Sequence, residues 1–240
     1  MSYERIAETA SHMPVDFPSA EYEKIRELFV SKYAITHRSQ RRLFGEGWNG
    51  LLFRYRAMNE YHEEFTTSIK HHGNSPPFEE RYKQEKTLFG FFVSSISAIE
   101  CFFYSNYFVG AVLKPDEFPI DSESLRLVKP RCLVKMFKAN FPKEALTGKM
   151  KKCVDDTMCI EMTNMRDVLS HRGALAHNID GEKVAIPSNP KATSDQRRWD
   201  FPINEGTTAN HRQWVSDTIR DLISAMHEFC LKHFLGNTLL

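Results

Sequence analysis

A long run of apolar residues near the middle of the sequence limits the folds that this chain can adopt. Residues 88–113 read LFGFFVSSISAIECFFYSNYFVGAVL and contain one formal charge, Glu100. A helix of that length can cross a bilayer, but a carboxylate at its centre costs roughly 2.5–3.5 kcal/mol on membrane insertion. A helix that is apolar nearly all round is also typical of the centre of a helical bundle. The segment therefore predicts a buried core helix, with a membrane span as the alternative.

Apolar residues at helical spacing continue on both sides of this segment. We expect long helices over residues 19–35, 47–71, 78–113 and 207–234, and another from about residue 148 to Gly173. One or two short helices are expected between Ser122 and Phe141, because Pro130 and Pro142 interrupt the pattern. The prediction is an all-α fold. Residues 1–77 would form an N-terminal helical extension packed on a helical domain of residues 78–240, as one compact unit.

Residues 174–207 differ from the rest of the chain in composition. Prolines and glycines recur along them, and the stretches 183–186 and 198–201 (KVAI and RWDF) could pair as strands. We therefore expect a short irregular or β-hairpin excursion before the last helix. A segment this long inside a compact domain is usually functional or mobile.

Charge, cysteine content and missing motifs exclude several classes of protein. The 32 Lys and Arg residues are balanced by 31 Asp and Glu residues, so any RNA contact must use a local basic patch. The five cysteines are odd in number and contain no C-x-x-C, which indicates reduced thiols in a cytoplasmic protein without a zinc site. The N-terminus lacks the apolar stretch of a signal peptide. Neither a P-loop, a dinucleotide-binding fingerprint nor H-E-x-x-H occurs, so we expect no cofactor and no metal.

One motif carries recognisable chemistry. Residues 166–173 read RDVLSHRG, which places Arg166 and His171 at the end of a predicted helix. An arginine matches phosphate oxygens with a permanent charge, and a histidine can act as acid or base near neutral pH. RNA can be cleaved without a metal if such groups activate the ribose 2′-hydroxyl, protonate the leaving oxygen and hold the phosphate. Alternatively, His171 stabilises the negative end of the helix dipole, and Arg166 pairs with a carboxylate of Glu161, Glu100 or Asp167.

The motif and its setting resemble the HEPN family, in which an Arg, a polar or acidic residue and then a His lie at the end of a helix. The resemblance covers about residues 85–235, including the apolar helix and the closing helix. It implies an up-and-down helical bundle and a metal-independent endoribonuclease of the kind found among toxins and defence proteins. The implied partners are RNA and an antitoxin or another regulatory protein. The alternative is a non-catalytic HEPN module that binds RNA, nucleotide or a protein partner.

The spacing of the motif bears on assembly. Five residues rotate by roughly 140° around a helix, so Arg166 and His171 do not share one stripe of a straight helix. They converge more easily if the helix ends at His171 or if two protomers build the site. HEPN proteins are often dimers with both motifs at one cleft. The resemblance thus implies a homodimer whose cleft contains two copies each of Arg166 and His171.

Further residues could support this site. Glu100 is costly to bury without a partner, and its natural partners are Arg166 and His171; a structural salt bridge is the equal alternative. Asp167 lies directly beside the motif arginine, and Arg172 and His177 repeat the same spacing across Gly173, which breaks the helix.

A basic stretch precedes the motif. Residues 129–152 contain eight basic residues and a single acid, Glu144. Lys149, Lys151 and Lys152 could guide an RNA backbone toward the cleft, although most charge runs are solvated helix faces. The remaining histidines lack a carboxylate or Cys partner at metal-ligand spacing, so we interpret them as surface residues.

Overall fold

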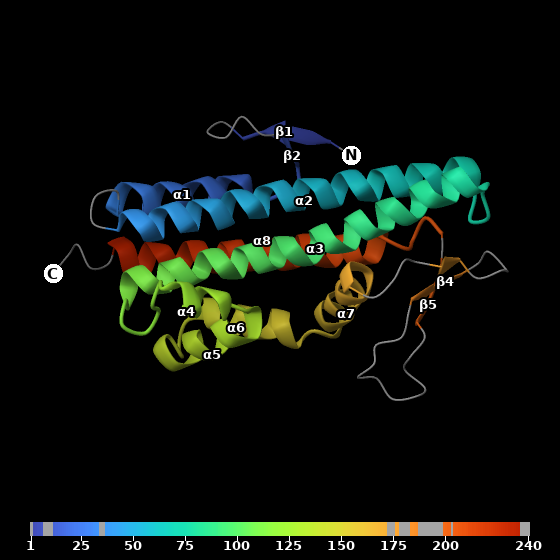
Figure 1. Ribbon diagram of the computed structural model, residues 1–240. Helices are drawn as coiled ribbons and strands as arrows, with labels where there is room; N and C mark the ends of the chain where they lie inside the picture. The colour runs from blue at the N-terminus through green and yellow to red at the C-terminus, as the bar shows by residue number, and fades with distance from the viewer. Residues whose placement is uncertain are drawn as a thin grey trace. The chain divides into compact units, whose positions relative to one another are not determined.

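The computed structural model describes residues 2–6, 12–33, 37–171, 176–177, 183–186, 199–202 and 204–235, and these residues are mostly helical (Figure 1). The helices are α1 (Ser19–Tyr33), α2 (Arg38–His72), α3 (Phe78–Leu113), α4 (Ser122–Arg126), α5 (Pro130–Asn140), α6 (Ala145–Asp155), α7 (Thr157–His171) and α8 (Ala209–Cys230), which continues into a π-helical turn, η2 (Leu231–Leu235). The strands are β1 (Tyr3–Arg5), β2 (His12–Pro14), β3 (Ala176–His177), β4 (Lys183–Ile186) and β5 (Trp199–Pro202). The predicted all-α class is confirmed, with two small sheets added.

The chain divides into two compact units. Unit 1 comprises Met1–Phe53, Ala98–Asp156 and Ser216–Leu240, and unit 2 comprises Arg54–Ser97 and Thr157–Val215. Each unit therefore contains residues of both predicted segments, 1–77 and 78–240. The N-terminus also differs from the predicted helical extension, because β1 and β2 form an antiparallel hairpin before α1.

The core of unit 1 is aromatic, and it joins α1 to the first part of α2. The rings of Tyr22 and Trp48 stack with centroids 4.7 Å apart. The Tyr22 hydroxyl donates a hydrogen bond to the Trp48 carbonyl, and the Trp48 indole donates one to the Tyr22 carbonyl. Phe29 and Phe44 stack in the same way at 4.2 Å. The two helices are thus held side by side by fully buried rings whose polar atoms are satisfied.

The start of α2 departs from the sequence prediction. We expected the helix to begin near Gly47, and it begins at Arg38. Glycine in a helix interior costs about 1 kcal/mol relative to Ala, so Gly45 and Gly47 lower the helix propensity of this stretch. A Cβ added at Gly47 would lie 2.6 Å from Ser105 Oγ and 2.9 Å from the Tyr104 ring. The glycine allows α2 and α3 to approach closely, so packing outweighs its low helix propensity.

The expected helix over residues 148–173 is in fact two helices, α6 and α7. Asp156 separates them with an extended backbone, φ −66° and ψ 134°. Short polar residues such as Asp156 and Thr157 compete for backbone hydrogen bonds and favour helix ends over helix interiors. The apolar four-residue stripe continues across this break, which is why the sequence pattern did not reveal it.

Unit 2 combines parts of long helices with the small sheet. Its core contains Met58, Phe65, Phe91, Phe92, Met162 and Met165. The predicted hairpin is confirmed, because β4 pairs with β5 in antiparallel register, and β3 adds a short third strand. β4 contacts α7, so the sheet lies against the helix that carries the motif.

The apolar helix α3 begins and ends at the predicted residues, 78 and 113. It is long and apolar enough to cross a membrane, but 61% of its most apolar window is buried inside the protein. Ser95, Ser105 and Asn106 each donate a hydrogen bond to a carbonyl one turn earlier, so these buried donors are satisfied within the helix. This burial favours the core-helix interpretation over the membrane span.

Candidate functional site

The motif arginine is oriented by its neighbour on α7. The Arg166 side chain is 21% exposed, and its Nε donates to Asp167 Oδ1 at 2.8 Å. Asp167 itself is half exposed. Of the carboxylates considered as partners for Arg166, Asp167 therefore forms an ion pair with it. A half-buried guanidinium paired in this way is held in place but carries a partly offset charge.

The helix that carries Arg166 ends at His171. This end point is one of the two conditions under which an Arg and a His five residues apart can converge. The His171 and His177 side chains lie outside the described residues, as does the whole of Arg172; the backbone of His177 belongs to β3.

Glu100 is half-buried in the part of α3 that belongs to unit 1, whereas Arg166 belongs to unit 2. The predicted support of the motif by Glu100 therefore stays a prediction.

The three lysines proposed to bind RNA lie on α6. Lys149 Nζ is 2.6 Å from Asp221 Oδ2, and Lys151 Nζ is 2.6 Å from Asp155 Oδ2. Within the described part of the chain, no carboxylate lies within ion-pair distance of Lys152, which is exposed. The basic stretch is thus partly neutralised by acids, one of them on α8.

Two histidines that we interpreted as surface residues are packed inside unit 2, so that interpretation is wrong for them. His62 on α2 is half-buried, and its Nδ1 lies 2.6 Å from the Thr208 hydroxyl. His211 on α8 is 8% exposed, and its ring packs edge-on against Phe92 at 5.4 Å. His71 and His72, in contrast, are exposed at the end of α2, as expected.

Burial changes the acid–base behaviour of both histidines. Burial lowers the pKa of His62, and the neighbouring Arg212 cation lowers it further, against a smaller opposing effect of Glu63. Burial also lowers the pKa of His211, and Glu161 on α7 opposes this shift. Both rings are therefore neutral at neutral pH.

Arg212, the cation that lowers the pKa of His62, belongs to a chain of hydrogen bonds that continues on α2. Arg212 Nε donates to Asn59 Oδ1 at 2.8 Å, and the Asn59 amide donates to the Tyr55 carbonyl at 2.8 Å. One sequence signal pointed to the buried position of His62, because it lies on the stripe that contains Met58 and Phe65. No comparable signal exists for His211, since its burial depends on α3 and α7.

All five cysteines are free thiols. Among the residues that the structure describes, no group of three or more His, Cys, Asp or Glu side chains is placed to hold a metal ion.

Comparisons with protein-family models, with curated proteins and with solved structures found no match to this chain.

Proposed function

We propose that the chain is a metal-independent endoribonuclease of HEPN type, which cleaves RNA in a toxin or defence system. The observation that carries the proposal is the position of Arg166, whose half-buried guanidinium lies on α7 shortly before the helix ends at His171. In this proposal the enzyme acts in the cytoplasm, with RNA as substrate and an antitoxin or another regulatory protein as partner.

Each motif residue has a role in this reaction. His171 takes the proton of the ribose 2′-hydroxyl, whose oxygen then attacks the adjacent phosphorus. The bond from phosphorus to the 5′-oxygen breaks, and a protonated His171 supplies the proton that this leaving oxygen needs. Arg166 holds the phosphate while negative charge accumulates on it. The products are a 2′,3′-cyclic phosphate and a 5′-hydroxyl.

A dimer supplies the two histidines that this scheme uses. One neutral and one protonated imidazole can act as base and acid at the same time if two copies of His171 share a cleft. Asp167, Arg172 and His177 would then orient these groups or contact the phosphate. Glu100 would orient Arg166.

Cleavage of total RNA in EDTA tests the proposal. We expect His171→Ala and Arg166→Ala each to lower the cleavage rate at least about 100-fold, the loss typical for a general acid–base or charge-stabilising group. His72→Ala is a matched control, because His72 is also the last residue of its helix, α2. If His171 only stabilises the end of its helix, His171→Ala and His72→Ala should cleave RNA at the same rate.

Thermal unfolding of each variant separates loss of chemistry from loss of fold. If folded His171→Ala or Arg166→Ala cleaves RNA at the wild-type rate, the proposal is wrong.

Mixing wild type with the His171→Ala variant tests the shared cleft. A mixed dimer has only one of the two histidines that the scheme uses, so it should be inactive, and the cleavage rate should fall more steeply than the share of wild-type chains. A rate that falls in proportion to that share, with exchange of protomers shown by native mass spectrometry, would argue for a site within one chain.

One observation favours a second candidate, a non-catalytic HEPN module that binds RNA, nucleotide or a protein partner. The ion pair with Asp167 offsets the charge of Arg166, as expected for a residue with a structural role. This candidate predicts no cleavage of any RNA, but loss of dimerisation or binding in the same variants.

A further inference from the structure

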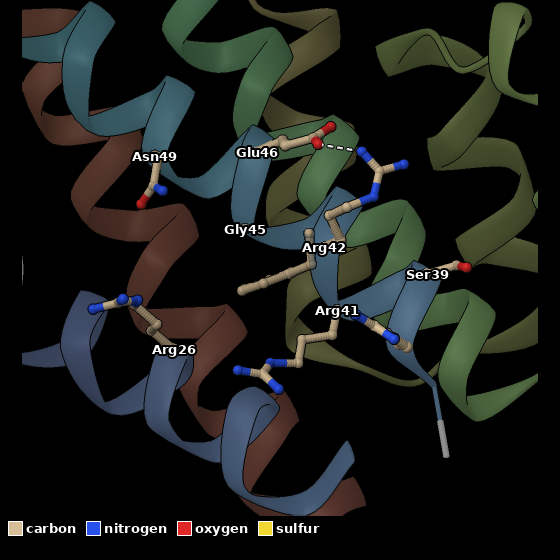
Figure 2. Close-up of a pocket in the computed structure, with 9 residues that line it drawn as sticks. Arg26, Ser39, Arg41, Arg42, Gly45, Glu46 and Asn49 are labelled. Carbon is tan, nitrogen blue, oxygen red and sulfur yellow. Dashed lines mark hydrogen bonds and ion pairs between the residues drawn. The ribbon is translucent and has the colours of Figure 1, made fainter. Parts of the chain in front are cut away.

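An arginine-lined cavity lies in unit 1. Its volume is about 560 Å³, which is in the usual range for a small-molecule site. Its lining residues come from α1 and the first turns of α2 and include Arg26, Arg38, Ser39, Arg41, Arg42 and Asn49. Figure 2 shows Arg41 extending from α2 toward the helix that carries Arg26.

The spacing along α2 explains why these side chains meet. Residues 38, 41, 42, 45 and 49 recur at three- and four-residue steps and therefore share one face of the helix. Gly45 lies in the middle of this face, and a Cβ added there would meet no atom within 4 Å. The glycine thus leaves open space between the arginines.

Part of the positive charge of the cavity is uncompensated among the described residues. Arg42 forms an ion pair with Glu46, the one carboxylate among the described residues that line the cavity (Figure 2). Within the described residues, no carboxylate lies within ion-pair distance of Arg38 or Arg41. The connection between α1 and α2 reads AIT at residues 34–36 and adds no acid. Arg38 and Arg41 therefore contribute two positive charges to the cavity without a carboxylate partner among the described residues.

The lining favours phosphate groups over a nucleobase. Guanidinium groups match phosphate oxygens in pairs, and Ser39 and Asn49 add further hydrogen-bond donors. Among the described lining residues, the one aromatic residue is Phe44, which is 1% exposed because it stacks on Phe29 and Trp48 in the core. It offers no free face on which a base could stack, which is how single-stranded nucleic acids are usually held.

We propose that this cavity binds a compact ligand with two or more adjacent phosphate groups, and that it reads these phosphates alone. This site is independent of the proposed RNA cleavage, because no motif residue lines it. Inorganic tripolyphosphate is the simplest probe of this chemistry. A nucleoside triphosphate should bind with similar affinity, since its base and sugar find no partner in the cavity.

Two variants test the site in different ways. Arg41→Ala removes a charged donor and should weaken tripolyphosphate binding about tenfold, as measured by titration calorimetry at low salt. Gly45→Leu keeps every charge and fills the open space, so it should weaken binding at least as much. Leucine also has the higher helix propensity, so this variant should remain folded.

Arg56→Ala is the matched control. Arg56 lies on the same helix and forms an i,i+4 ion pair with Glu60, just as Arg42 does with Glu46. It does not line the cavity, so its loss should leave tripolyphosphate affinity unchanged.

Three results would overturn the proposal. The first is no binding of tripolyphosphate to the wild-type protein. The second is equal affinity in wild type, Arg41→Ala and Gly45→Leu. The third is that the wild-type protein binds a single-stranded RNA oligonucleotide but not tripolyphosphate, and that Arg41→Ala and Gly45→Leu abolish the RNA binding. The site would then serve nucleic acid. None of these outcomes depends on whether the protein cleaves RNA.

Discussion

The molecule contains two arginine sites of opposite character. On α7 of unit 2, Arg166 is half-buried and ion-paired with the carboxylate beside it in the sequence. In the cavity of unit 1, arginines from two helices surround one carboxylate, and that carboxylate pairs with Arg42. The first site holds one cation in a defined place, and the second accumulates charge around open space.

The two proposed sites place different requirements on an arginine. A catalytic arginine must be positioned at a reacting phosphate, and a neighbouring carboxylate can orient it. A binding cavity must attract a highly charged anion from water, which requires charge that the protein itself does not neutralise. We therefore expect the two sites to respond differently to the same kind of substitution.

Removal of one arginine from each site should have the largest effect. We expect Arg166→Ala to lower RNA cleavage at least about 100-fold and to leave tripolyphosphate binding intact, whereas Arg41→Ala weakens that binding. Cleavage assays and calorimetry on the same preparations make the comparison. If Arg166→Ala weakens tripolyphosphate binding as much as Arg41→Ala does, the two arginines serve one ligand and the distinction fails.

Two glycines test whether the space in the cavity is really open. An added Cβ at Gly90 would lie 2.5 Å from the Tyr61 ring, while one at Gly45 meets nothing. Gly90→Ala should destabilise the protein by about 1–3 kcal/mol through overpacking. Gly45→Ala should stabilise it by up to about 1 kcal/mol, through helix propensity. Urea unfolding measures both, and similar destabilisation by both would mean that the α2 face is filled.

The buried histidines of unit 2 predict a pH dependence of stability. The pKa values of His62 and His211 lie below their ordinary value of 6.5 in the folded protein. The unfolded chain therefore binds more protons below about pH 6.5, and the stability that the neutral rings contribute is present above this pH and lost as pH falls. The melting temperature should drop between pH 7 and pH 5.5.

His211→Phe keeps a ring against Phe92 and cannot titrate, so this variant should show a weaker drop. A wild-type protein that melts at the same temperature at both pH values would contradict the neutral, buried state of these rings. So would a variant with the full wild-type drop.

The smallest effects should come from the lysines of α6. Lys149→Ala should cost only about 0.2–1 kcal/mol of stability, because its ion pair with Asp221 is exposed. If this face guides RNA, Lys152→Ala should weaken RNA binding more than Lys149→Ala, since Asp221 already offsets the Lys149 charge. Binding titrations at several salt concentrations compare the two; equal, negligible changes would place the RNA path elsewhere.

Much of the fold could be predicted from local pattern. The bounds of α3, the end of α7 near Gly173 and the strand pairing of residues 183–186 all follow from features within a few residues: apolar periodicity, helix-breaking residues and strand-forming residues. The helix start at Arg38 could not be predicted, because it depends on the approach of α3 at Gly47. The break at Asp156 was also missed, since the apolar stripe continues across it.

In the candidate site too, some features follow from neighbouring residues in the sequence and others only from the tertiary structure. The sequence alone determined which residues form the motif, that a helix ends at it and that a long apolar helix occupies the core, because these are properties of neighbouring residues. Only the tertiary structure decided which charges are neutralised, which histidines are buried and where arginines from α1 and α2 gather. Lys149 pairs with an acid 72 residues away, and Arg26 of α1 lines the same cavity as Arg41 of α2, so no local pattern could indicate either. Charge compensation and burial depend on the distance between side chains in space, and the fold sets those distances.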